Sequence, residues 1–224
     1  MKRGKKYKTV AEKIDKNKSY PIDEAVKLVR EKKIAKFDES VEIHIKLSID
    51  TKKGEEQVRG TVVLPHGTGK SKKVAVITST KVREAKDAKA DIVGGEEMIT
   101  KLKSGKFNFD VLVATPEMMP RLASIAKILG PKGLMPSPKT ETVTEKVKET
   151  VEMLKKGKVN FKNDDTGNIH QIIGKVSFTE EQLKGNFEAF LEAVKKAKPA
   201  TVKGKFIKSI SVCSTMGPGI KIGI

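Results

Sequence analysis

The sequence contains little of what disulfide-linked, membrane-spanning or base-stacking proteins require. Among 224 residues it has one cysteine, Cys213, no tryptophan, and only 4% aromatic residues. A single thiol excludes an intramolecular disulfide and a multi-thiolate zinc site. No apolar run approaches the roughly 18 residues of a membrane-spanning helix. With eight Phe and two Tyr, a sheet that stacks several RNA bases is not supported. We therefore expect a reduced, cytoplasmic protein with no membrane partner.

Positive charge is what the sequence has in excess. Lys and Arg number 46 against 28 Asp and Glu, which gives a net charge of +18 and a pI near 9.8. This balance favours a polyanionic partner over an acidic substrate. Charge does not locate the binding face, because residues 68–159 carry +8 and the remainder +10. The basic stretch Lys2–Lys8 lacks the apolar segment of a secretory signal, and it is either an electrostatic arm or a solvated tail.

Two stretches marked by Gly and Pro punctuation, residues 64–73 and 155–168, divide the chain. Between them, short apolar runs alternate with helical patterns, which is typical of a parallel sheet covered by helices on both faces. Thr142 and Glu145 have the spacing of a capping box for the last helix. The predicted strands are 74–78, 90–93 and 110–115, and the predicted helices are 82–89, 96–102, 119–129 and 144–155.

The segments outside these stretches follow a different pattern. Apolar residues at positions 22, 25, 26 and 29 predict an amphipathic helix after Pro21. Strict alternation from Val41 to Ile49 predicts a half-buried strand whose polar face carries Glu42, His44 and Lys46. The remaining predicted elements are strands 57–64, 170–176 and 206–213 and a helix over 179–197, which Thr179 and Gln182 would cap.

Each terminal segment alone is short of packing partners, so we expect the two to fold together. The predicted fold class is α/β (α+β) with two domains. Residues 1–67 and 160–224 form a split, two-layer α/β sandwich domain. Residues 68–159 form an inserted three-layer α/β/α Rossmann-like domain. The two connections predict hinges near residues 65–71 and 155–160.

The motifs of common enzymes fail when their spacing is checked. The GTGKS string at Gly67–Ser71 resembles a phosphate-binding loop, but the Walker pattern requires Gly at the position of Leu64. A Walker loop also follows its strand and opens a helix, whereas this string precedes the predicted strand 74–78. Lys72 replaces the third Gly of the dinucleotide fingerprint. No nucleophile elbow is present. The three histidines, His44, His66 and His170, lack the spacing of metal ligands. We predict no catalytic residues, no cofactor and no metal.

Polar residues on the predicted strands suggest a nucleic-acid surface instead. In the C-terminal strand, Phe206, Ile210 and Val212 alternate with Ile207, Ser209, Ser211 and Cys213. The second set is mainly small and hydroxylic, and it leads into the turn 215–219. Small side chains and glycine allow a backbone or 2′-OH to approach closely. Glu42, His44, Lys46 and Lys175 could join this surface, although a plain solvated strand face is the usual alternative. Phe37 is expected in the core or as a staple.

Several long strings resemble one family, in order and over nearly the whole chain. They are VRGTVVLPHGTGK (58–70), ILGPKGLMPSPK (128–139), GKVNFKNDDTGNIH (157–170) and STMGPGIKI (214–222). They are similar to the ribosomal protein L-one (L1) family in its bacterial form, the stalk protein of the large ribosomal subunit. The resemblance implies a non-enzymatic monomer whose split domain binds large-subunit rRNA and whose second domain sits on a hinge. It also implies help in releasing deacylated tRNA from the exit site, and repression of the protein's own operon mRNA.

The resemblance further implies which residues contact RNA. Ser40 replaces the Thr often found at its position and keeps the hydroxyl. The resemblance implies no settled contact for the GPKGLMPSPK loop, 130–139. The implied RNA-binding positions are Lys36, Phe37, Ser40, Glu42, Lys46, His170, Gly174, Lys175, Ser211, Thr215, Met216 and Gly217.

Two other hypotheses remain open from the sequence. A protein that coats nucleic acid through charge alone would show a logarithmic salt slope of roughly −0.9 per phosphate neutralised on duplex DNA, with little sequence preference. A nucleotide-dependent enzyme built on residues 68–159 would be stabilised by ATP or GTP. The failed phosphate-loop pattern opposes the enzyme.

Overall fold

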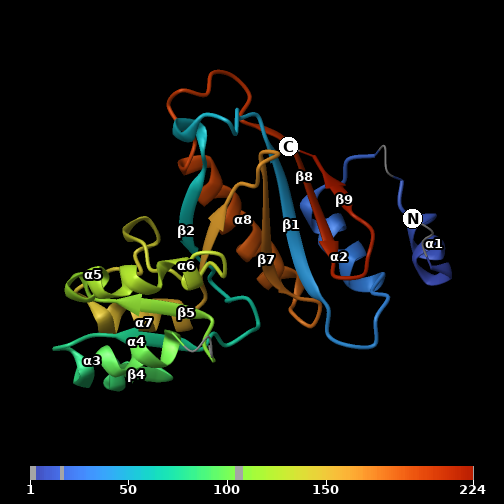
Figure 1. Cartoon of the computed structure of the whole chain (residues 1–224). Coiled ribbons are helices and arrows are strands. Elements are labelled where there is room, and N and C mark those ends of the chain that lie inside the picture. Colours follow the sequence, from blue (N-terminus) through green and yellow to red (C-terminus); the bar gives the residue numbers. More distant parts are fainter. Residues whose placement is uncertain (1–3, 16–17, 104–107, 224) are drawn as a thin grey trace. The chain divides into compact units, whose positions relative to one another are not determined.

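The computed structural model describes residues 4–15, 18–103 and 108–223. The chain divides into two compact units, one formed by residues 1–69 and 159–224 (unit 1) and one by residues 70–158 (unit 2) (Figure 1). The mixed α/β class is confirmed. Of the basic stretch Lys2–Lys8, Lys2 and Arg3 lie outside the described residues, and Lys5 begins a short helix. None of the helices in the described ranges is long and apolar enough to span a membrane.

Unit 1 is built on a four-stranded antiparallel sheet in the order β7-β1-β8-β9. The central strand β1 lies between two strands from the other end of the chain, and a separate ribbon pairs β2 with β6. The elements of unit 1 are α1 (Lys5–Ala11), α2 (Ile22–Glu31), β1 (Ser40–Leu47), the 3₁₀ turn η1 (Gly54–Glu56), β2 (Arg59–Val63), β6 (Lys158–Lys162), β7 (Asn168–Lys175), α8 (Glu180–Lys196), β8 (Ile207–Ser214) and β9 (Ile220–Ile222).

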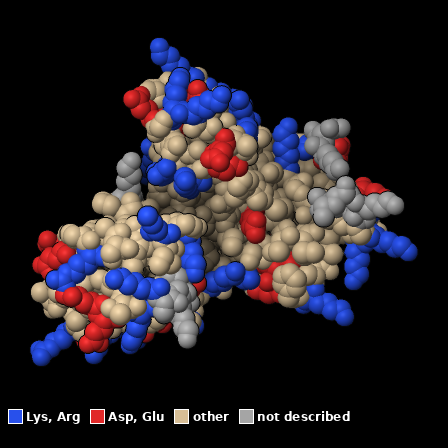
Figure 2. Space-filling view, viewed as in Figure 1, with Lys and Arg blue, Asp and Glu red and all other residues tan. Residues whose placement is uncertain are grey.

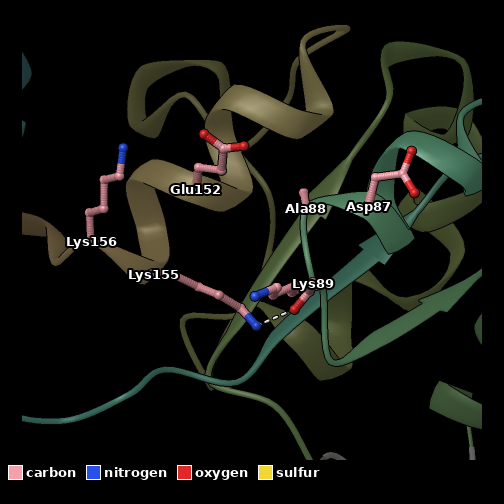
Figure 3. A pocket seen from close by; sticks show the side chains of 6 residues that line it. All are labelled: Asp87, Ala88, Lys89, Glu152, Lys155 and Lys156. Atoms are coloured by element: carbon pink, nitrogen blue, oxygen red, sulfur yellow. Dashed lines mark hydrogen bonds between the residues drawn. The ribbon is translucent and has the colours of Figure 1, made fainter.

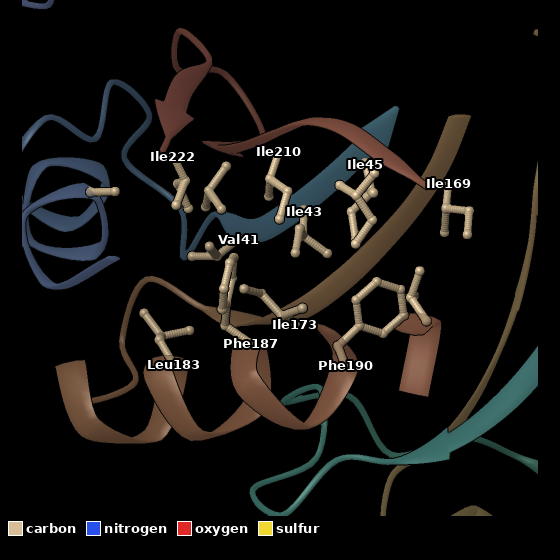
Figure 4. Packing of buried hydrophobic residues seen from close by; sticks show 14 of the residues in the cluster. Val41, Ile43, Ile45, Ile169, Ile173, Leu183, Phe187, Phe190, Ile210 and Ile222 are labelled. Atoms are coloured by element: carbon tan, nitrogen blue, oxygen red, sulfur yellow. The ribbon is translucent and has the colours of Figure 1, made fainter. Parts of the chain in front are cut away.

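One face of this sheet is buried by helices. The alternation predicted for β1 is present, since Val41, Ile43, Ile45 and Leu47 are all at most 1% exposed. Figure 4 shows apolar side chains of α8, including Phe187 and Phe190, pointing toward these strands. The Thr179 capping box is confirmed, because Thr179 Oγ1 accepts from the Gln182 N–H and Gln182 Oε1 accepts from the Thr179 N–H. The opposite face of the sheet carries the polar side chains.

An irregularity in β8 overturns one sequence prediction. Lys46 lies opposite Ser209, but Leu47 lies opposite Ile207, so Lys208 has no partner in β1. The extra residue reverses the side-chain direction at that point. Ile207 is therefore 6% exposed and belongs to the core, so its predicted place on the polar face was wrong.

Unit 2 is a three-layer structure around the parallel sheet β4-β3-β5. All four residues of β3 are buried, because α3 and α7 cover one face and α4 to α6 cover the other. The elements are β3 (Val74–Ile77), α3 (Val82–Asp87), β4 (Ile92–Gly94), α4 (Glu96–Lys103), β5 (Val111–Ala114), η2 (Pro116–Met118), α5 (Met119–Leu122), η3 (Ala123–Ile125), α6 (Ala126–Leu129), η4 (Pro138–Thr140) and α7 (Val147–Lys155).

Two local predictions for unit 2 were wrong. The continuous helix expected over 119–129 is interrupted by the 3₁₀ segment Ala123–Ile125. Here Ser124 Oγ donates to the Arg121 carbonyl, which competes with regular helical bonding at that point. The capping box of Thr142 and Glu145 does not form, because α7 begins only at Val147.

Candidate nucleic-acid interface

The exposed side of the unit 1 sheet brings together polar residues from three strands. On β1 they occupy alternate positions. Register places His44 opposite both His170 of β7 and Ser211 of β8, and Glu42 opposite Cys213. We call this set the polar sheet face; its members are Glu42, His44, Lys46, His170, Ser211 and Cys213.

Hydrogen bonds link the side chains of this face across the strands. The Nδ1 atoms of His44 and His170 are 2.7 Å apart, and His44 Nε2 lies 3.1 Å from Cys213 Sγ. Burial and the neighbouring His170 lower the pKa of His44, against an opposing effect of Glu42. Burial, with a smaller contribution from Glu42, raises the pKa of Cys213 to about 11. The thiol is therefore protonated at neutral pH and is not a reactive nucleophile.

A buried carboxylate organises the end of the sheet where β1 begins. Glu39 is 0% exposed. Its Oε1 accepts hydrogen bonds from the N–H groups of Ile34 (2.9 Å) and Ala35 (2.6 Å), and its Oε2 accepts one from Met216 N–H at 3.2 Å. Burial alone would raise the pKa of Glu39, but hydrogen bonds from the Ser214 side chain and these backbone groups outweigh it and leave the pKa below its usual value. Glu39 thus joins the loop before β1 to the turn after β8.

The turn after β8 is held against β1 by Thr215. Its Oγ1 accepts from the Ser40 N–H at 3.0 Å, and its own N–H donates to the Ser40 carbonyl at 3.0 Å. Gly217 packs closely against Ser214, because a Cβ at this position would lie 2.5 Å from Ser214 Oγ and would force that hydroxyl to move. Both residues therefore shape the turn that presents Met216.

Two large apolar side chains project from the segments that Glu39 joins. Phe37 is 56% exposed and Met216 is 53% exposed. The expectation that Phe37 lies in the core or acts as a staple was wrong. Glu39 holds the backbone at Ile34 and Ala35, just before Phe37, and the Phe37 ring lies on the surface. We call the group around Glu39 the Glu39 cluster; it comprises Lys36, Phe37, Glu39, Ser40, Lys175, Thr215, Met216 and Gly217.

Three of the residues implied by the family resemblance have additional structural contacts. Lys175 Nζ donates to the Asp38 carbonyl at 3.1 Å, and Lys46 Nζ donates to the Thr166 carbonyl. Gly174 is buried on the helix side, where a Cβ would lie 2.7 Å from Leu183 Cδ2. Gly174 therefore allows α8 to pack closely, whereas each lysine amino group donates to a backbone carbonyl of unit 1.

Sequence reasoning missed Glu39 and Asp164. Asp164 accepts hydrogen bonds from the N–H groups of Thr166 and Asn168, and these hold its pKa far below the usual value. An Asx-type signal was present in the string NDDTGN. No local pattern marks Glu39, since its partners include residue 216.

The second unit offers a weaker candidate site. An open pocket next to α3 and α7 is lined by Asp87, Ala88, Lys89, Glu152, Lys155 and Lys156 (Figure 3). Lys155 is already engaged with Asp91 at 3.3 Å and with the Lys89 carbonyl. The glycine-rich stretch 67–73 leads into β3 and opens no helix, so it lacks the architecture of a phosphate-binding loop.

The fold and the polar sheet face together define a class of protein. A basic two-unit α/β protein with one uncovered, polar sheet face is typical of proteins that bind a structured polyanion. Figure 2 shows Lys and Arg side chains spread over the visible surface rather than gathered in one patch. Charge therefore supplies general attraction, and the site must be sought in local geometry.

Comparison with known proteins identifies the family. Residues 29–218 match the model of the ribosomal protein L1p/L10e family. The chain is 56% identical over 221 residues to the large ribosomal subunit protein uL1 of Mesoplasma florum, covering 98% of this chain and 97% of that one. It is 53% identical over 219 residues to the uL1 proteins of Mycoplasma capricolum and Mycoplasma mycoides, in each case over 97% of both chains. The chain belongs to the ribosomal protein L1p/L10e family, and it is a structural, non-enzymatic component of the large ribosomal subunit.

Proposed function

We propose that unit 1 binds large-subunit rRNA through the Glu39 cluster and the adjoining polar sheet face. The observation that carries the proposal is the exposure of Phe37 and Met216 on two segments that the buried Glu39 joins. Single exposed apolar side chains are common on protein surfaces, so the support for a contact surface is that one buried carboxylate fixes the backbone next to both of these side chains. Membership of a large-subunit ribosomal family supplies the class of partner.

The arrangement favours recognition of RNA shape. Lys36, Lys46 and Lys175 lie where they can neutralise phosphates. Ser211 and Gly217 leave room for a sugar–phosphate backbone and can approach a 2′-OH. Phe37 offers one ring for stacking, well short of a platform for several bases. The predicted contacts Ser40, Glu42, His170, Gly174 and Thr215 complete the proposed interface; of these, Gly174 and Thr215 act through the backbone geometry they maintain.

The same proposal includes a hinge between the two units and a role in tRNA release. We infer that the two units are domains joined at hinges near 65–71 and 155–160, and that the free protein is a monomer. On the ribosome this hinge would allow the mobile stalk to move and to assist release of deacylated tRNA from the exit site. Two connecting segments between compact units support such motion.

The test of RNA binding compares exposed residues in the two units. Phe37→Ala is expected to weaken binding to the stalk-base fragment of rRNA by roughly ten- to a hundredfold, as for loss of a stacked ring, and Met216→Ala to weaken it less. Met153→Ala is the matched control, because Met153 is 41% exposed on unit 2. Binding is measured by equilibrium titration at several salt concentrations with excess unrelated structured RNA. Melting temperatures should be nearly unchanged in all three variants.

Two results would overturn the proposed interface. Equal binding of all RNAs at every salt concentration would favour a protein that coats nucleic acid through charge. Equal losses for Met153→Ala and Met216→Ala would place the contact elsewhere.

Repression of the protein's own operon mRNA uses the same surface in this proposal. The operon leader RNA should therefore compete with the rRNA fragment for the wild-type protein, and Phe37→Ala should weaken both complexes in parallel. Simultaneous binding of the two RNAs would contradict a shared site.

A further inference from the structure

Three metal-ligating atoms of different chemistry meet on the polar sheet face. They belong to Glu42, His44 and Cys213, and all lie within 4.8 Å of one another. His44 Nε2 is 3.1 Å from Cys213 Sγ and 4.0 Å from Glu42 Oε2. Glu42 and His44 occupy alternate positions of β1, and Cys213 of β8 lies directly opposite Glu42. Strand pairing therefore places the side chains of all three residues on one face of the sheet.

These separations are close to those of a tetrahedral zinc site. Zinc binds thiolate sulfur at about 2.3 Å, imidazole nitrogen at about 2.0–2.1 Å and carboxylate oxygen at about 2.0–2.2 Å. Tetrahedral angles then place neighbouring ligand atoms roughly 3.3–3.6 Å apart. The distance from His44 Nε2 to Cys213 Sγ, 3.1 Å, lies just below this range, and the distance to Glu42 Oε2, 4.0 Å, lies above it. Rotation of the Glu42 and Cys213 side chains is sufficient to bring the three atoms to ligand separations. A thiolate, an imidazole and a carboxylate together favour zinc-like cations over Mg²⁺, which prefers oxygen ligands alone.

Hydrogen bonds orient His44 for this role. Its Nδ1 faces His170 Nδ1 at 2.7 Å, and His170 Nε2 faces Asp164 Oδ2 at 3.4 Å. When His170 carries its proton on Nε2, toward the carboxylate, its Nδ1 accepts a hydrogen bond from His44 Nδ1–H. The lone pair of His44 then lies on Nε2, toward Cys213 and Glu42. Metal-binding histidines are typically oriented by a partner on the other ring nitrogen in this way.

We propose that Glu42, His44 and Cys213 form a binding site for a zinc-like divalent cation, with His170 and Asp164 orienting His44. Binding replaces the S–H bond of Cys213 with a sulfur–metal bond, and the proton passes to solvent. Solvent or an incoming ligand takes the remaining position. The site goes beyond the proposed RNA binding and does not depend on it. It also departs from the sequence expectation of no metal, because Cys213 lies 169 positions from His44 and only strand pairing joins them.

The test uses the full-length, reduced and metal-free protein without RNA. Titration with Co²⁺ should give thiolate-to-cobalt charge-transfer absorption and tetrahedral d–d bands that saturate at one equivalent, and Zn²⁺ should displace the cobalt. Cys213→Ser should abolish the charge-transfer band, and His44→Gln should weaken Co²⁺ binding at least tenfold. His170→Gln should weaken it on the order of tenfold through loss of orientation. The matched control is His66→Gln, an exposed histidine outside the cluster, which should bind as the wild type does.

Several outcomes would overturn the proposal. They are the absence of a charge-transfer band in the wild type, an unchanged band in Cys213→Ser, or displacement of Co²⁺ by millimolar Mg²⁺. Thermal melting gives a second readout: Zn²⁺ should raise the melting temperature of the wild type and of His66→Gln, but not that of Cys213→Ser. Cys213→Ala repeats the test if the serine variant does not fold. Because Phe37 and Met216 are not ligands, failure of metal binding and failure of RNA binding are separate results.

Discussion

The sheets of the two units differ in how far helices cover their faces. In unit 2 the parallel sheet β4-β3-β5 is covered on both faces, and every residue of β3 is buried. In unit 1, α2 and α8 pack on one face of the antiparallel sheet, and alternate residues of β1 on the other face remain partly accessible. Antiparallel sheets can leave one face to solvent, whereas parallel sheets rarely do. We therefore place the proposed partner site on the polar sheet face of unit 1.

The largest effects are expected from core substitutions, which should differ between the two units in their effect on RNA binding. Phe190 is 0% exposed and packs edge-on against Phe161 in unit 1, so Phe190→Ala should destabilise that unit by about 3–5 kcal/mol and abolish RNA binding. Leu122 is 0% exposed in unit 2, and Leu122→Ala should destabilise that unit by about 2–5 kcal/mol while RNA affinity is retained. Denaturant unfolding and RNA titration measure the two quantities. Loss of RNA affinity in both variants would mean that the units do not act as separate domains.

An intermediate effect is expected at Glu39, the buried carboxylate of unit 1. Glu39→Gln leaves buried N–H donors poorly satisfied and should cost about 1–3 kcal/mol of unfolding free energy, with weaker RNA binding because Phe37 and Met216 lose their support. The folded-state pKa of Glu39 lies below its ordinary value of 4.5. The contribution of the carboxylate is therefore complete above that value and is lost as the pH falls through the lower, folded-state pKa.

The measurement is the unfolding free energy of both proteins from neutral to acidic pH. The difference between wild type and Glu39→Gln should shrink only on the acidic side. A difference that stayed constant down to the acid limit would show that the ionised carboxylate contributes nothing specific.

The smallest effect concerns helix capping in the two units. Thr179→Ala should destabilise unit 1 by about 1 kcal/mol, because the hydroxyl caps the Gln182 N–H at the start of α8. Glu145→Ala in unit 2 should be nearly neutral, since α7 has no side-chain cap. Thermal unfolding of the pair checks the contrast. An equal loss of stability in Thr179→Ala and Glu145→Ala would show that Glu145 does cap α7, against the structure.

Periodic features of this chain were predictable, because they depend on the local sequence. The alternation from Val41 onward, the helix after Pro21 and the Thr179 cap each follow from residues within one element. The interrupted helix at 119–129 and the inward turn of Ile207 were not predictable in this way. A serine hydroxyl competing for a carbonyl and a single unpaired residue in β8 override an otherwise regular pattern.

The candidate sites depend on contacts between distant segments. In the sequence, Glu39 has no feature that distinguishes it from a surface carboxylate, because its partner Met216 is 177 positions away. Likewise, only the pairing of β1 with β8 places His44 beside Cys213. The implied RNA-binding residues came from the resemblance to a family rather than from periodicity. Composition alone indicated a polyanionic partner and no more.

The insertion of unit 2 also determines the order in which the chain can fold during its synthesis. β1 has both of its sheet neighbours after residue 167, so more than a hundred residues must be translated before it can pair. At roughly 5–20 residues per second, β1 waits on the order of 6–25 s. Unit 2 is continuous and can fold during that interval. Its two ends then lie together, with Lys72 Nζ donating to the Lys158 carbonyl at 2.7 Å. Folding of unit 2 thereby shortens the loop that unit 1 must close.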